Sequence, residues 1–207
     1  MSGTHLSDEL ESLRKTVEEF AHEVVAPTIG DLYERNEFPY DIVRQMGEMG
    51  LFGLPFPEEY GGMGGDYFAL CVAIEELARV DSSVAITLEA AVSLGAMPIF
   101  RFGTEEQKQK WLPRLCTGEW LAAFGLTEPG GGSDAGNPRT RAELDGDEWV
   151  INGTKAFITN SGTDITRLVT VLCRTGDRAD GRPELTSILV PVPHDGFRAS
   201  KKYSKVG

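Results

Sequence analysis

FGLTEPGGGSD, residues 124–134, lies where the helical periodicity of the first half of the chain gives way to short alternating segments. A short apolar run leads to Thr127, and a glycine-rich turn follows it. Glycines let a ligand approach the backbone closely, and successive amides can form a nest that binds an anion. No Gly-Lys-Ser/Thr follows, and the glycine spacing is not that of a dinucleotide fingerprint. Composition alone leaves a surface loop and a phosphate cradle equally open.

A second informative stretch, INGTKAFITN, covers residues 151–160. Residues 155–159 read as a strand, in which Phe157 and Thr159 are two positions apart and share a face. Such a pair could pack beside a flat heterocycle and hydrogen-bond its edge. The alternative is a core phenylalanine next to a threonine whose hydroxyl is already satisfied.

The residues before about 120 have helical spacing. Apolar residues recur every three or four positions from Leu6 to Val24, which predicts a helix that Pro27 ends. Thr104 and Gln107 form a capping-box pattern at the start of another helix. Further helices are expected at 41–49, from Asp66 as N-cap through Arg79, and at 84–100, the last almost wholly apolar.

After residue 120 the pattern changes to short β-type runs, at 142–144, 148–151, 155–159, 168–173 and 185–192. Asp145-Gly146 is a favoured hairpin pair between the first two runs. Helices followed by strands indicate an α+β fold. We therefore expect an all-helical domain at 1–120 and an antiparallel β domain at 121–207, which looks incomplete because the chain stops without a closing element.

Composition narrows the class of protein. The chain has 207 residues, 41% of them apolar and 25% charged, with a net charge of -12. This charge disfavours nucleic acid and anionic lipid as partners. No stretch approaches the roughly 18 apolar residues of a membrane span, and no secretory signal opens the chain, so we expect a cytoplasmic protein. The scattered cysteines predict reduced, buried thiols, and the scattered histidines indicate no metal site.

Taken together, the two stretches resemble the acyl-CoA dehydrogenase family. The pattern Leu-Thr-Glu-Pro-Gly-x-Gly-Ser-Asp from Leu126 is followed about twenty residues later by Ile-Asn-Gly-x-Lys-x-Phe-Ile-Thr-Asn from Ile151. Three earlier segments also fit the family: 57–62, 74–78 and 102–113. The resemblance therefore runs through almost the whole chain.

The resemblance implies an FAD protein, usually a homotetramer, with a helical domain, a middle β domain and a second helical domain. The Thr127 hydroxyl would lie near the pyrimidine edge of the flavin, and Gly132 and Ser133 at the pyrophosphate. Many members have Trp where this chain has Phe157. The implied FAD contacts are Phe124, Leu126, Thr127, Gly132, Ser133, Phe157, Ile158 and Thr159. The implied acyl-CoA contacts are Ser133, Ala90, Ala91 and Leu94, although small residues at 90 and 91 also suit ordinary helix packing.

The family reaction is α,β-dehydrogenation of an acyl-CoA thioester, with a glutamate as base, hydride transfer to flavin N5, and electron-transfer flavoprotein as the usual oxidant. The base comes from the last helical domain, beyond residue 207, so no catalytic residue is expected here and the chain alone should be inactive. In the family, the glutamate at the position of Glu128 belongs to the loop framework. Two alternatives stay open: an acyl-CoA oxidase or nitroalkane oxidase of the same fold, and a non-enzymatic module.

Overall fold

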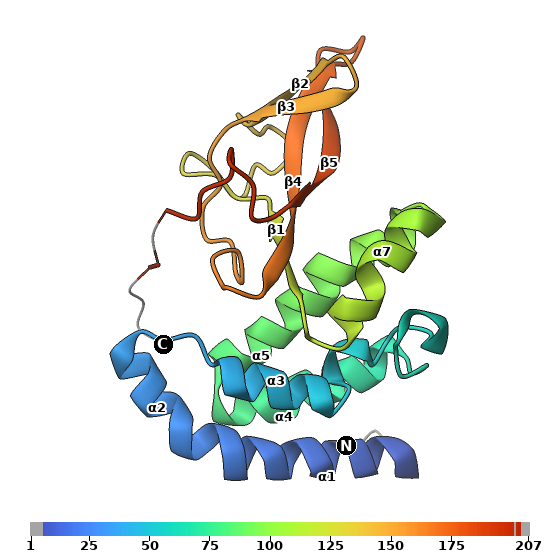
Figure 1. Cartoon of the computed structure of the whole chain (residues 1–207), viewed down its shortest axis with the longest axis vertical. Helices are drawn as coiled ribbons and strands as arrows, with labels where there is room; N and C mark the ends of the chain where they lie inside the picture. The colour runs from blue at the N-terminus through green and yellow to red at the C-terminus, as the bar shows by residue number, and fades with distance from the viewer. Residues whose placement is uncertain (1–5, 201, 204–207) are drawn as a thin grey trace. The chain divides into compact units, whose positions relative to one another are not determined.

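The computed structural model describes residues 6–200 and 202–203. They form two compact units, one running through Trp120 and one beginning at Leu121 (Figure 1).

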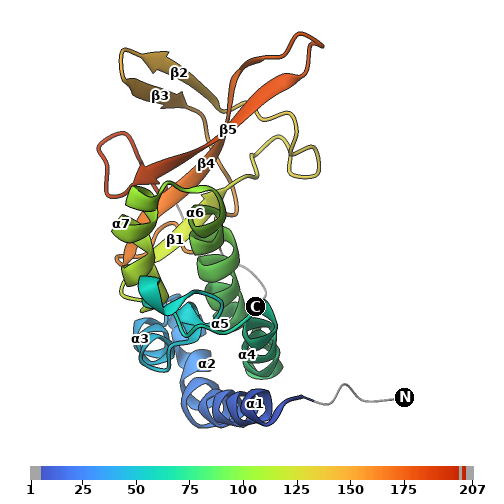
Figure 2. The ribbon, with the colours of Figure 1, turned by 90° about the vertical axis from the view of Figure 1, so that its right-hand side faces the viewer.

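The first unit is helical throughout. Its α1 and α4 lie side by side, and α5, η4 and α6 follow one another along one rod (Figures 1 and 2). Its elements are α1 (Asp8–Phe20), η1 (Ala21–Val25), α2 (Ala26–Arg35), α3 (Tyr40–Glu48), η2 (Leu51–Gly53), η3 (Glu58–Tyr60), α4 (Tyr67–Val80), α5 (Ser82–Glu89), η4 (Ala90–Ala96), α6 (Met97–Phe102) and α7 (Glu105–Cys116).

Pro27 does not end the first helix, contrary to the prediction from the sequence. The chain passes from α1 through the π-helical turn η1 into α2 and stops at Asn36, which has a left-handed φ of 55°. The amide of Ala26 donates to the carbonyl of Ala21, five residues back. Because proline has no N–H and crowds the carbonyl four residues before it, a π turn placed just ahead of Pro27 removes the conflict.

The predicted helix starts at Asp66 and Thr104 are confirmed. The Asp66 carboxylate accepts from the Ala69 amide at 2.9 Å. Thr104 and Gln107 exchange both bonds of a capping box, at 2.9 and 3.3 Å. These caps satisfy amides that have no partner within their own helix.

The apolar helix expected at 84–100 extends from Ser82 to Phe102 and contains the π turn η4. By length and composition its 21 residues would suffice to cross a membrane, so the sequence-based expectation that no stretch approaches this length was wrong. Over half of its apolar window, 56%, is buried inside the protein. A core helix of a folded domain has this same composition.

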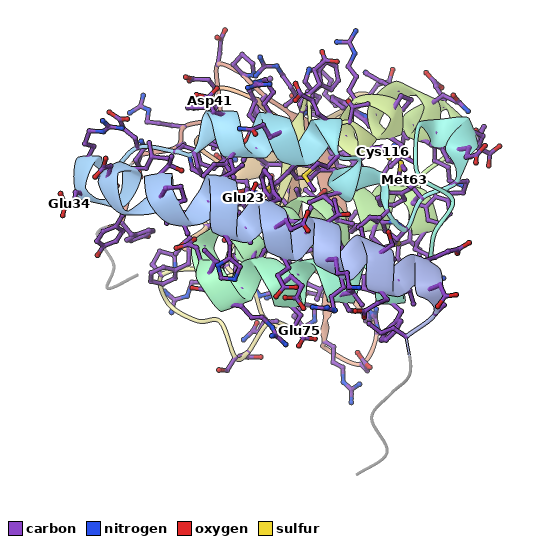
Figure 3. All side chains as sticks on the ribbon, turned by 90° about the horizontal axis from the view of Figure 1, so that it is seen from below. Glu23, Glu34, Asp41, Met63, Glu75 and Cys116 are labelled. Carbon is purple, nitrogen blue, oxygen red and sulfur yellow. The ribbon has the colours of Figure 1, made fainter. Side chains whose placement is uncertain are left out.

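The exterior of the helical unit is acidic. Glu23, Glu34, Asp41 and Glu75, labelled in Figure 3, are all exposed. Glu76 is the exception, because its side chain is only 2% exposed. It lies between the guanidinium groups of Arg14, at 3.6 Å, and Arg79, at 3.5 Å, and the pair with Arg14 ties α1 to α4.

The second unit is a five-stranded sheet made of β1 (Leu121–Gly125), β2 (Arg141–Asp145), β3 (Glu148–Asn152), β4 (Thr166–Asp177) and β5 (Pro183–Pro191). The long strand β4 is central, with β1 and β2 along one edge and β5 along the other (Figure 1). Its core cluster consists of Ala123, Ala142, Val169, Val171, Cys173 and Val192.

The sheet is mixed, whereas the sequence analysis expected an antiparallel one. The pairs β2–β3 and β4–β5 are antiparallel hairpins. In contrast, β4 runs parallel to β1, with Ala123 opposite Val169, and parallel to β2 at Arg141 and Arg174. Forty intervening residues at 126–165 separate β1 from β4, and a long crossover of this kind is what a parallel pair requires.

Residues 155–159 do not form the predicted strand, because β3 ends at Asn152. Phe157 has a φ of 58°, which no strand residue adopts, so Phe157 and Thr159 do not share a strand face.

The prediction of buried thiols also needs correction. All three cysteines are unpaired, but only Cys116 (Figure 3) and Cys173 are buried, and Cys71 is exposed.

Candidate functional site

The glycine-rich loop begins where β1 ends. Glu128 and Gly131 exchange two backbone hydrogen bonds, at 3.0 and 3.1 Å, which close a tight turn. Gly130, Gly131 and Gly132 are exposed on this turn. A Cβ added to Gly132 would lie 3.2 Å from Thr127 Cγ2, so the turn folds closely over Thr127 and leaves little room for a side chain.

Glu128 is buried beneath the loop and accepts four hydrogen bonds. The amide of Arg139 donates to Oε2 at 2.7 Å. The amide and hydroxyl of Thr140 donate to Oε1 at 2.9 and 2.6 Å, and Lys155 Nζ donates to the same oxygen at 2.9 Å. The Lys155 and Glu128 side chains are 10% and 9% exposed, so this is a buried ion pair.

The surroundings of Glu128 fix its ionisation. Burial by itself would raise the pKa of the carboxyl, but the hydrogen bonds from Thr140, Lys155 and Arg139 outweigh it and lower the pKa to about 2. Glu128 is therefore a carboxylate at any physiological pH, with its oxygens already occupied. A general base needs a pKa near the working pH, so the geometry assigns Glu128 a structural role.

The backbone around Thr127 is held from one side. Lys155 Nζ donates to the Leu126 carbonyl at 3.1 Å, and the Ala156 amide donates to the Thr127 carbonyl at 2.8 Å. Among the described residues, the Thr127 hydroxyl has no hydrogen-bond partner, and the side chain is half-buried. This hydroxyl is therefore free to bind a ligand.

The second predicted segment is a turn with an exposed aromatic ring. Phe157 is 67% exposed and its ring stacks on Tyr203, with the centroids 4.7 Å apart. A bulky residue with positive φ is strained, and such strain often marks a ligand site. Ile158 packs against the core of the sheet, and Thr159 is half-buried.

A shallow hollow of about 260 Å³ adjoins the glycine-rich loop. It is lined by Glu128, Pro129, Gly130, Arg139, Thr140, Gly153 and Thr154. The sequence analysis selected none of these as contacts, and it missed Lys155, Arg139 and Thr140 as members of the site. The Lys155 in Ile-Asn-Gly-x-Lys was visible in the motif, but its acidic partner lies 27 positions away and only the fold joins them.

The acyl-chain candidates lie in the π turn η4 of the helical unit. Ala90 and Ala91 are 3% and 4% exposed, whereas Leu94 is 44% exposed. Next to Leu94, the Ser93 hydroxyl accepts a 2.5 Å hydrogen bond from Tyr67. A π turn inside a helix frequently accompanies a functional site. The fourth candidate, Ser133, is an exposed residue of the other unit.

In the part of the chain that the structure describes, no cluster of metal-ligating side chains occurs.

Both units match known proteins of one family. Residues 7–119 match the acyl-CoA dehydrogenase amino-terminal domain, and residues 123–207 match the middle domain of the same family. A probable acyl-CoA dehydrogenase of Bacillus subtilis is 44% identical over 202 residues, which are 98% of this chain and 53% of that protein.

Solved structures give the same result. Butyryl-CoA dehydrogenase from Megasphaera elsdenii superposes with a TM-score of 0.90 at 38% identity, covering 99% of this chain and 54% of that one. A glutaryl-CoA dehydrogenase from Mycobacterium smegmatis in complex with FADH2 has a TM-score of 0.88 at 33% identity, covering 97% and 50%. The chain thus spans about half the length of the relatives it matches. With both domain models matched in order and the fold shared throughout, the chain belongs to the acyl-CoA dehydrogenase family.

Proposed function

We propose that these residues supply the amino-terminal and middle portions of an FAD-dependent acyl-CoA dehydrogenase. The observation that carries the proposal is the match of the two family domains, in order, over nearly the whole chain. In agreement with it, the matched loop presents a Thr127 hydroxyl that no described residue binds, beside exposed glycines. Successive backbone amides in such a turn suit a pyrophosphate, and a hydroxyl suits the polar edge of a flavin ring.

In this proposal the FAD contacts are those implied by the resemblance. Phe124, Leu126 and Thr127 line the flavin, Gly132 and Ser133 meet the pyrophosphate, and the 157–159 turn flanks the ring. The exposed Phe157 ring is already placed to stack, since it packs face to face with Tyr203. FAD supplies the hydride acceptor when it is bound. The acyl-CoA contacts in this proposal are also those implied by the resemblance: Ser133, Ala90, Ala91 and Leu94, of which Leu94 is 44% exposed.

The substrate class follows from the family: an acyl-CoA thioester, oxidised between its α and β carbons, with electron-transfer flavoprotein as the acceptor and a homo-oligomer as the assembly. No residue described here is assigned as the base that removes the α-proton. We therefore expect no acyl-CoA turnover from these 207 residues alone. Flavin bleaching at an ordinary enzymatic rate on anaerobic addition of acyl-CoA would contradict this expectation.

The first test is a visible absorbance spectrum of the chain after incubation with FAD and desalting. Retained flavin supports the proposal, and the Thr127→Val variant should then retain less, because it loses only the hydroxyl. Gly132→Ala should act in the same direction, since its Cβ would press on Thr127. Gly136→Ala is the matched control, because a Cβ at Gly136 meets nothing within 4 Å. Equal flavin retention by Thr127→Val and the unmodified chain would refute the assigned contact.

A further inference from the structure

The buried ion pair of Glu128 and Lys155 has no part in the contacts proposed above. Both side chains are nine-tenths or more buried, directly behind the glycine-rich loop. Withdrawing two charges from water is expensive, and a buried pair often stabilises a fold no better than apolar residues would. A pair this well hydrogen-bonded therefore calls for a role beyond stability.

The ion pair joins three segments that are distant in sequence. Glu128 stands at the start of the loop, and its carboxylate binds the amides of Arg139 and Thr140 at the end of the loop. Both ends of the loop are therefore fixed to one side chain. Lys155, from the third segment, bridges that carboxylate and the Leu126 carbonyl.

The same contacts define the orientation of Thr127. Lys155 binds the carbonyl before Thr127, and the Ala156 amide binds the carbonyl of Thr127 itself. With both carbonyls engaged from one side, the peptide planes on either side of Thr127 cannot rotate freely.

We propose that Lys155 and Glu128 are positioning residues of the flavin site, a clamp that holds Thr127 and the amides of Gly132 and Ser133 ready for the cofactor. The inference rests on the proposed function for the identity of the ligand. The clamp acts by preorganisation: a loop already ordered loses less entropy when it binds. Neither side chain needs to touch FAD.

Two variants open the clamp in different ways. Lys155→Met removes the ammonium while keeping a similar length of chain. Gly153→Ala keeps every charge but adds a Cβ that would overlap the Thr140 hydroxyl, with Thr140 Cβ only 2.6 Å away. Because it leaves the ion pair in place, Gly153→Ala stays informative if Lys155→Met does not fold.

Each variant has a matched control. Asp177→Asn removes a different ion pair of the same sheet, the one with Arg174 at the far end of β4. Gly136→Ala adds a Cβ to a glycine within the same loop, where open space surrounds it. Both controls leave the clamp intact.

The first measurement needs no flavin: amide order parameters of residues 130–133 from NMR relaxation. We expect about 0.85 in the unmodified chain and both controls, and a fall below about 0.6 in the two clamp variants. A purely structural role would lower the stability of the folded state and leave the folded loop as ordered as before. Clamp variants that fold and keep a rigid loop would overturn the proposal.

The second measurement is FAD affinity, from quenching of flavin fluorescence. We expect the dissociation constant to rise at least about tenfold in both clamp variants and to change less than about twofold in the controls. A loosened loop with unchanged FAD affinity would also overturn the positioning role. If the unmodified chain binds no FAD, the proposed function fails for these residues, while the order parameters still decide whether the clamp holds the loop.

Discussion

Because Glu128 has a low pKa, the second unit, the β sheet, should lose stability as the pH falls. A free glutamate has a pKa of 4.5, and Glu128 in the folded chain has a pKa of about 2. Because the folded pKa is the lower one, the unfolded state takes up a proton first. The stabilisation is therefore complete above pH 4.5 and is lost as the pH falls towards 2.

The size of the effect follows from the two pKa values. Lowering the pKa from 4.5 to about 2 corresponds to about 3 kcal/mol of stability, of which about 2 kcal/mol is lost by pH 3. The Glu128 side chain is only 9% exposed, so solvent screens it little. A hydrogen bond from Arg14 also lowers the pKa of Glu11, and hydrogen bonds from Gln109 and Tyr60 lower the pKa of Glu105. Both of these residues belong to the helical unit.

The assay is urea unfolding at pH 7, 5, 4 and 3, followed through the amide signals of β4 so that only the β unit is measured. Glu128→Gln is the reference variant, because it cannot lose a charge at this position. At pH 7 we expect it to be less stable by about 3–5 kcal/mol, as for a broken buried pair. By pH 3 this difference should shrink by about 2 kcal/mol. A difference that stays constant from pH 7 to pH 3 would refute the assignment of the low pKa to Glu128.

Three further predictions concern the helical unit and the thiols. Thr104→Ala should destabilise the helical unit by about 1 kcal/mol in thermal unfolding, because it removes one half of the capping box, and Thr104→Ser should not. Phe56→Ala should cost about 3–5 kcal/mol in urea unfolding, because the ring is fully buried; an effect below 1 kcal/mol would mean that the core collapses around the gap. Of the three thiols, only Cys71 should react with a thiol reagent in the native chain, because it is exposed. Burial raises the pKa of Cys116 to about 12 and also raises the pKa of Cys173, so neither forms the reactive thiolate readily. Mass spectrometry counts the labelled thiols, and native labelling of all three would contradict the structure.

Local signals in the sequence predicted local structure. Asp66 and Thr104 lie three positions before the amides they cap, so four consecutive residues contain the whole interaction. The β2–β3 hairpin is similarly short, and its turn uses Gly146 with a φ of 62°. The glycine-rich loop was found for the same reason, because its residues are contiguous.

Partners that are distant in sequence could not be inferred in this way. The parallel pairing of β1 with β4 depends on a crossover of 40 residues, and the four donors to Glu128 come from residues 11 to 27 positions away. Pro27 failed as a helix end for another reason. The rule that proline stops a helix assumes α-helical bonding, and a π turn placed before the proline avoids the clash.

At residues 155–159 the contacts of Lys155 and its neighbours replace the predicted strand with a turn. Alternation in a strand would place the side chains of Lys155, Phe157 and Thr159 on one face. In the structure, however, Lys155 reaches inward to the Glu128 carboxylate, the Ala156 amide binds Thr127, and Ile158 packs into the core. With residues 155, 156 and 158 anchored, the backbone of Phe157 absorbs the change of direction at a positive φ, a strain of roughly 1–3 kcal/mol. The ring is consequently turned outward to solvent, so the contacts that hold the glycine-rich loop also present the aromatic surface proposed to flank the flavin.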